Sequence, residues 1–257
     1  MNFRQTTLVA ALALSSLPVW AQTAAAPAAS ASDWTVAGNA GLFSDYTFRG
    51  ISQTARKPAF QGGIDISHAS GLYVGNWNSN VDSAFYNGAN LEMDFYGGYK
   101  ASVGDFGFDV GALYYYYPGS GAGGTTKINN TELYVGATWG PLTAKYSYAV
   151  SDFFSAANSK GSAYLDLGFS HDLGNGFGVN AHAGYQRLKG GAITAQINGS
   201  KPNSILDFKL GATYTVEGFV LGGALVGTSR DYTAGTAALS NKNISNNTFV
   251  VSVSKSF

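Results

Sequence analysis

The chain has 257 residues, with 15 Lys and Arg against 15 Asp and Glu, and it contains no cysteine. An even charge balance gives no overall attraction to phosphate, which argues against nucleic acid as a partner, and the absence of cysteine excludes disulfides, thiolate catalysis and cysteine-based zinc sites. With 12% charged residues, 14% aromatic residues and 34 glycines, the composition suits a sheet that faces an apolar solvent, although a soluble secreted β-protein would also fit.

The first residues have the pattern of a cleaved secretion signal. Arg4 supplies a positive charge, residues 8–14 form a short apolar run, and Ala21 ends a plausible cleavage site. We predict a signal peptide over residues 1–21 and a flexible periplasmic leader over residues 22–33, which leaves residues 34–257 for the folded domain. After the signal no segment has 18 consecutive apolar residues, so the sequence predicts no transmembrane helix.

From residue 34 onward, apolar and polar residues alternate with a period of two, which is the period of side chains along a β-strand. The phase of two of the predicted strands, 72–81 and 219–227, stays open because apolar residues fall on both faces. The pattern predicts about twelve strands, over residues 34–49, 60–67, 72–81, 90–103, 106–116, 131–139, 142–150, 163–169, 177–186, 206–214, 219–227 and 248–257.

The clearest alternation lies at residues 90–103. Leu91 and Phe95 fall on one face, whereas Glu92, Asp94 and Lys100 fall on the other. The segment is about 13 residues long, and strands of globular proteins usually have about 5–6 residues, whereas a tilted strand that crosses a membrane needs about 9–11. The length therefore favours a membrane strand.

Short and long connections alternate between the predicted strands. The short ones are residues 68–71, 104–105, 140–141, 172–176 and 216–218, and the long ones are 50–57, 82–89, 118–128, 152–160, 188–202 and 230–247. A membrane barrel has short periplasmic turns and longer outer loops, whereas a Greek-key sandwich has no reason to alternate in this way. Hydrocarbon leaves backbone polar groups unsatisfied unless the sheet closes on itself. The sequence therefore predicts an all-β fold, a transmembrane antiparallel up-and-down barrel.

Aromatic residues recur near the predicted ends of the strands. Rings at both rims of a barrel would form two girdles at the membrane surfaces. We place Tyr46, Phe48, Tyr114, Tyr116, Tyr146 and Tyr148 at the outer rim, and Phe106, Trp139, Phe169, Phe177, Tyr214 and Phe219 at the short-turn rim.

Charged and polar residues on the opposite faces of these strands would line a pore. The predicted set is Asp45, Arg49, Asp65, Glu92, Asp94, Lys100, Asp109, Glu132, Lys145, Asp166, His182, Asp207 and Lys209. Its acidic excess indicates a weak preference for cations. Twelve strands should leave a narrow channel, because eight are already filled by side chains. The alternatives are an interior closed by ion pairs, by inward tyrosines or by an infolded loop.

No motif indicates chemistry. Residues 119–124 match the dinucleotide fingerprint G-x-G-x-x-G, but a strand follows them where that site needs a helix. His182 faces the predicted interior, where a hydrolase would pair it with a serine nucleophile, yet no nucleophile motif is present and a polar wall residue is the simpler interpretation. We therefore expect no catalytic residue, no metal site and no cofactor.

Several short motifs occur along the chain, at residues 45–53 (DYTFRGISQ), 71–77 (GLYVGNW), 92–99 (EMDFYGGY), 164–166 (YLD) and 184–185 (GY). With these motifs the chain resembles the TorF-like porin family of proteobacteria, over nearly the whole mature chain. This resemblance implies an outer-membrane barrel that forms a pore, without an established substrate or catalytic residues. The terminal Phe257 also looks like the signal that the barrel-assembly machinery recognises.

The sequence thus leads to a functional hypothesis. The chain is expected in the outer membrane of a Gram-negative bacterium, in contact with its lipid, as a monomer or small homo-oligomer that lets small hydrophilic solutes or ions diffuse. A non-conducting structural or adhesive barrel and an outer-membrane hydrolase are the alternatives.

Overall fold

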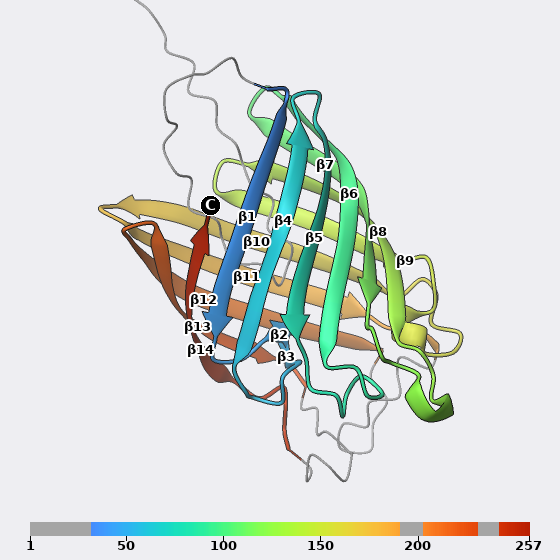
Figure 1. Cartoon of the computed structure of the whole chain (residues 1–257). Helices are drawn as coiled ribbons and strands as arrows, with labels where there is room; N and C mark the ends of the chain where they lie inside the picture. Colours follow the sequence, from blue (N-terminus) through green and yellow to red (C-terminus); the bar gives the residue numbers. More distant parts are fainter. Residues whose placement is uncertain (1–31, 191–202, 231–241) are drawn as a thin grey trace, which may run out of the picture.

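The computed structural model describes residues 32–190, 203–230 and 242–257 (Figure 1). Twelve strands form one closed antiparallel barrel, which confirms the predicted fold class. They are β1 (Trp34–Phe43), β4 (Ala59–His68), β5 (Leu72–Asn80), β6 (Leu91–Val103), β7 (Phe106–Tyr116), β8 (Asn129–Trp139), β9 (Leu142–Ala149), β10 (Ala163–Gly174), β11 (Phe177–Arg187), β12 (Ser204–Val216), β13 (Phe219–Thr228) and β14 (Thr248–Ser256).

Each strand pairs with its neighbours in the sequence, and β1 pairs with β14 to close the ring. At this seam Gly41 lies opposite Ser254. Beyond the last pair, the Gly38 N–H donates to the Phe257 carbonyl oxygen at 2.7 Å, and the Phe257 N–H donates back at 3.0 Å. Closure leaves no strand edge with unpaired backbone groups.

The connections alternate in length as predicted. Short turns join β4 to β5, β6 to β7, β8 to β9, β10 to β11 and β12 to β13, all at one end of the barrel (Figure 1). The last of these turns consists of Glu217 and Gly218, with φ of 50° and 75°. Positive φ at both positions suits a two-residue hairpin loop, because that turn matches the twist of the flanking strands. The predicted loops 188–202 and 230–247 lie partly outside the described residues.

The outer surface of the barrel is apolar and its inner surface is polar. On β6, Phe95 and Tyr99 are exposed on the outside, whereas Glu92 and Asp94 are 1% and 5% exposed. The two open phases are also resolved. Leu72 and Val74 of β5 and Leu221 and Leu225 of β13 face outward, and Trp77 and Val226 are buried inside.

The first strand is shorter than predicted. It ends at Phe43, not at residue 49, and the chain then folds into the barrel as a hairpin of β2 (Thr47–Phe48) and β3 (Ile51–Ser52). Arg49 and Gly50 form its turn, with φ of 48° and 77°, again positive at both positions. The β2–β3 hairpin lies inside the ring of strands (Figure 1).

This hairpin corrects the assignment of two aromatic residues to the outer girdle. Tyr46 is 2% exposed within the interior, and the Phe48 ring lies 5.7 Å from Tyr115 and 5.8 Å from Phe154. The alternating pattern of this segment was correctly recognised, but alternation does not tell a strand that continues from one that turns inward.

Two short 3-10 turns lie in the long connections, η1 (Ala122–Gly124) between β7 and β8 and η2 (Phe153–Ser155) between β9 and β10. The glycine-rich segment 119–124 therefore leads through three residues of 3-10 turn into a strand. Within the described ranges, no helix is long and apolar enough to span a bilayer. The predicted signal peptide and nearly all of the predicted leader lie outside the described residues.

Candidate functional site

The interior of the barrel holds the charged residues that the alternating pattern placed there. Nine of the thirteen are buried, three are half-buried, and Lys100 is exposed beside the β4–β5 turn. The buried ones are Asp45, Arg49, Glu92, Asp94, Asp109, Glu132, Lys145, Asp166 and Asp207, and the half-buried ones are Asp65, His182 and Lys209. Asp45 and Arg49 reach the interior from the infolded segment, not from β1.

Arg49 anchors the β2–β3 hairpin to the far wall. Its Nη2 donates to both carboxylate oxygens of Glu132 on β8, at 3.0 and 2.8 Å, and its Nη1 donates to Gln186 on β11. The guanidinium also lies 4.2 Å from the ring centroid of Tyr164 and 4.6 Å from that of Phe48. A buried, charge-assisted ion pair with ring contacts is among the stronger polar arrangements, so the hairpin is held firmly.

Aromatic side chains fill the interior beside β5 to β8. Tyr46 donates a hydrogen bond of 3.0 Å to Glu92 and contacts Trp77 edge to face. Tyr86 stacks on Tyr117 with ring centroids 4.3 Å apart. The cluster of buried residues is Tyr46, Ala59, Trp77, Val81, Tyr86, Ala89, Leu113, Tyr115, Tyr117 and Tyr134. These packed side chains occupy this part of the interior.

Further hydrogen bonds of tyrosine side chains join β4 to β8. Tyr73 donates to Asp109 at 2.6 Å and contacts Tyr134 hydroxyl to hydroxyl, and Tyr96 donates to Asp65 at 2.6 Å. Asp109 and Asp65, which the sequence placed on a pore wall, thus accept hydrogen bonds from these tyrosines.

His182 lies between two carboxylates. Its Nδ1 is 2.6 Å from Asp166 and its Nε2 is 2.6 Å from Asp207, which also accepts a hydrogen bond from Tyr164. Ionised carboxylates only accept, so the ring is placed to donate from both nitrogens, as an imidazolium does. A general base needs one nitrogen free for a nucleophile, and this arrangement leaves none.

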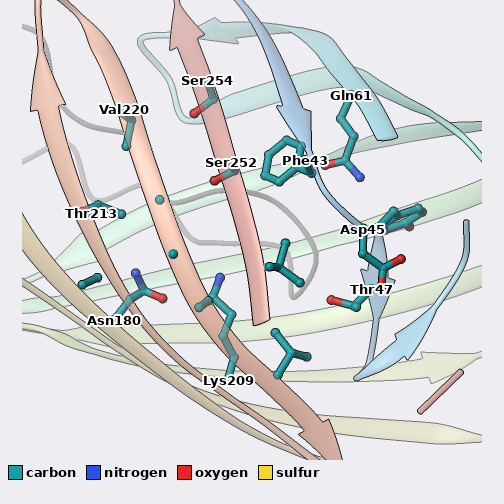
Figure 2. A pocket seen from close by; sticks show the side chains of 17 residues that line it. Phe43, Asp45, Thr47, Gln61, Asn180, Lys209, Thr213, Val220, Ser252 and Ser254 are labelled. Atoms are coloured by element: carbon teal, nitrogen blue, oxygen red, sulfur yellow. The ribbon is translucent and has the colours of Figure 1, made fainter. Parts of the chain in front are cut away.

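A cavity of about 110 Å³ remains between the hairpin and the wall formed by β11 to β14. Figure 2 shows Asn180 and Lys209 on one side of it and Asp45 and Thr47 on the other. Gly222 and Ala224 on β13 and Ser252 on β14 give this wall small side chains. The space exists because the large side chains of the interior gather beside β5 to β8.

Asp45 is held by its own loop. Its carboxylate accepts hydrogen bonds from Ser52 at 2.6 Å and Thr54 at 2.9 Å and pairs with Arg56 at 3.2 Å. Burial raises the pKa of the Asp45 carboxyl, and this effect exceeds the lowering by the two hydroxyl donors and the Arg56 charge. The negative charge of Asp45 is therefore compensated within the infolded segment.

An infolded loop was one of the alternatives that the sequence left open, but the sequence did not locate it before β4, and it predicted neither the Arg49 anchor nor the position of the cavity. The positively charged partner Arg56 was also missed, because it falls in a segment that the pattern assigns to an outer loop. The consecutive residues Arg49 and Gly50 at a break in the alternation were the available signal. In the part of the chain that the structure describes, no group of His, Asp and Glu is placed to hold a metal ion.

Comparison with known proteins gives matches at the level of family and fold. A family model described as "Bacterial protein of unknown function (Gcw_chp)" matches residues 27–257. The NanC porin has a TM-score of 0.55 at 11% identity, over 86% of this chain and 99% of that one. The KdgM porin has a TM-score of 0.51 at 8% identity, over 87% and 99%. No curated protein matches. These structural matches show a porin-like fold.

Proposed function

The chain belongs to the Gcw_chp family of bacterial proteins of unknown function, and we propose, on the basis of its barrel, that it is an outer-membrane channel for the passive diffusion of small hydrophilic solutes or ions. Because its motifs resemble those of the TorF-like porins, we also propose that the chain is a porin of this type. The porin-like fold supports the proposal.

One observation carries the proposal. The interior retains a cavity of about 110 Å³ along β11 to β14, bordered by both polar and apolar side chains, even with the hairpin folded inside. Eight strands leave an interior just filled by side chains, and the width grows with the number of strands. A twelve-stranded barrel therefore has room for both the hairpin and a path beside it.

The outer surface supports a place in a membrane. Leu210 and Val36 are 64% and 67% exposed, and a soluble protein rarely presents a continuous apolar surface of this kind. In the closed ring each strand pairs on both sides, so the backbone N–H and C=O groups along the strands find partners, as a hydrocarbon environment requires. We propose membrane lipid as the partner of this surface, the barrel-assembly machinery as the partner of Phe257, and a monomer or small homo-oligomer as the assembly.

Planar-bilayer recording of the refolded protein tests the channel. We expect discrete current steps when the folded barrel is added and none when the same protein is added after heat denaturation. Folding is checked first by anomalous migration of the unboiled protein on a gel. A folded barrel that leaves the bilayer reproducibly silent would contradict the proposal.

A charge on the outer wall should be costly. Leu210→Lys is expected to lower the free energy of unfolding in lipid vesicles by about 2–4 kcal/mol, because a lysine near the middle of the bilayer loses its hydration. Thr213→Lys on the same strand faces the interior cavity and should cost less than about 1 kcal/mol by the same argument. Urea unfolding followed by tryptophan fluorescence measures both. Equal effects would place Leu210 away from lipid.

One observation favours a second function. The hairpin and the aromatic cluster close much of the interior, as they would in a non-conducting structural or adhesive barrel whose outer loops carry binding. The silent bilayer described above is the result that this alternative predicts. The hydrolase hypothesis has no comparable support, because both ring nitrogens of its best candidate, His182, face carboxylates.

A further inference from the structure

Lys209 is a positive charge at the cavity without a partner. It extends from β12 into the cavity, and it forms no hydrogen bond or ion pair with any residue in the three described ranges. Arg49 and Arg56 differ, since Arg49 is neutralised by Glu132 and Arg56 by Asp45. Lys145 also has no ion pair among the described residues, but it does not border the cavity. Lys209 is thus the cation of the cavity wall that forms no ion pair.

The carboxylates nearest to Lys209 along the wall are already in use. His182 lies opposite Lys209 in the β11–β12 register, and Asp207 precedes it by one inward position on β12. Asp166 and Asp207 both bind the His182 ring, and none of these three residues borders the cavity. Asp45, which does border it, is paired with Arg56.

Asn180 adds an unsatisfied amide to the same wall. Its side chain is 8% exposed, and its Oδ1 has no hydrogen-bond partner among the described residues. Buried polar groups are nearly always paired, with protein or with ordered water. The Asn180 Oδ1 only accepts, so a water molecule would satisfy it, whereas the Nδ2 of the same amide can donate to an anion in the cavity.

The hydroxyls of Thr213, Ser252 and Ser254 add polar groups to a wall that also has apolar side chains. A cavity needs about 10–15 Å³ on this measure to hold one water molecule, so a cavity of about 110 Å³ admits several water molecules or one small organic ion. From these features we infer that the cavity is a binding site for a small anion of the carboxylate or sulfonate class, held by Lys209 and by the Asn180 amide.

This inference rests on the proposed function and names the solute class of the channel. The simple count of interior charges predicts the opposite preference, for cations, because it includes carboxylates that are bound to arginine, histidine and tyrosine. A passing solute responds to the charges that border its path, and along this cavity the uncompensated charge is positive.

A single cysteine provides the test, because the chain has no cysteine of its own. Ser252→Cys places a thiol in the cavity wall. Its modification is timed by mass spectrometry with two methanethiosulfonate reagents of similar size, one with a sulfonate and one with a trimethylammonium group. In each case the thiolate displaces sulfinate and forms a mixed disulfide. Taking the ratio of the two rates removes the intrinsic reactivity of the thiol.

We expect the ratio to favour the sulfonate reagent by about fivefold relative to free glutathione, since one charge a few ångströms away in a wet cavity has an effect of this order. In the Lys209→Gln background the ratio should return to that of glutathione. Lys100→Gln removes a lysine that does not border the cavity and should leave the ratio high. Thr213→Cys serves if Ser252→Cys does not give a closed barrel.

A ratio that Lys209→Gln leaves unchanged, or one that favours the cationic reagent, would overturn the inference. The labelling needs no current, so it separates this inference from the channel itself. If the bilayer shows no current but the labelling ratio is as expected, the channel is refuted and the anion site is retained. If the barrel conducts but the ratio equals that of glutathione, the channel is retained and the anion site is refuted.

Discussion

Replacing Arg49 with alanine is expected to raise the single-channel conductance about twofold, because the hairpin loses its anchor and the interior widens. The guanidinium bridges β2–β3 to Glu132 on β8 and to Gln186 on β11, whereas Phe48 makes ring contacts only, with Tyr115 and Phe154. The free energy of unfolding should fall by about 3–5 kcal/mol, since Glu132 is left buried without a counter-charge. Bilayer recording gives the conductance, and urea unfolding in vesicles gives the free energy of unfolding.

Two further variants separate the anchor from general damage. Arg49→Ala combined with Glu132→Gln removes the stranded charge, so it should recover part of the stability while the conductance stays high. Lys57 follows the hairpin on the same connection, and Lys57→Ala breaks the ion pair of this exposed lysine with Asp82 on the β5–β6 connection. The change is expected to cost no more than about 1 kcal/mol, with unchanged conductance. If Arg49→Ala folds and conducts like the parent protein, the hairpin does not restrict the current.

The second large effect is expected at His182. His182→Ala removes the donor between Asp166 and Asp207, whose side chains are 10% and 1% exposed. Two buried carboxylates then face each other without a positive group, and we expect a loss of about 3–5 kcal/mol in the free energy of unfolding. Urea unfolding followed by tryptophan fluorescence measures this loss.

Matched changes show whether the loss comes from the carboxylates. Adding Asp207→Asn to His182→Ala removes one of the opposed charges and should restore part of the stability. His171→Ala changes an exposed histidine near a turn and is expected to stay within about 0.5 kcal/mol of the parent protein. A His182→Ala barrel as stable as the parent would mean that the three residues contribute nothing as a group.

The barrel was predictable because the outer face of each strand meets an apolar environment and the inner face a polar one. The row from Leu91 to Tyr99 on β6 faces outward and Glu92 and Asp94 face inward, and a period of two records this difference residue by residue. Connection lengths gave the topology for a similar reason, since short turns at one end and long loops at the other follow directly from the order of the strands.

The hairpin was not predictable from the same pattern. Its two strands have two residues each, too few to establish a period of their own, and Asp45, Tyr46, Thr47 and Phe48 alternate as a continuing β1 would. What turns the segment inward is the set of contacts that Arg49 makes with residues 83 and 137 positions away. Such contacts are a property of the folded barrel.

Alternation predicted the inward face for most charges of the candidate site, but it did not predict their pairing. Alternation puts Glu132, Asp166 and Asp207 inside, and it says nothing about which of them meets Arg49 or His182. Pairing depends on the distance across the barrel, which involves strands far apart in the sequence. The cavity beside Lys209 was missed for the same reason.

The Arg49 anchor also constrains the order of assembly. Its contact with Gln186 closes a loop of 137 residues, and contacts between such distant residues form slowly because chain entropy opposes them. The segment that carries Arg49 leaves the ribosome early, yet its binding surface exists only after β8 and β11 have paired with their neighbours. The interior is therefore occupied late in folding, by one of the first segments synthesised.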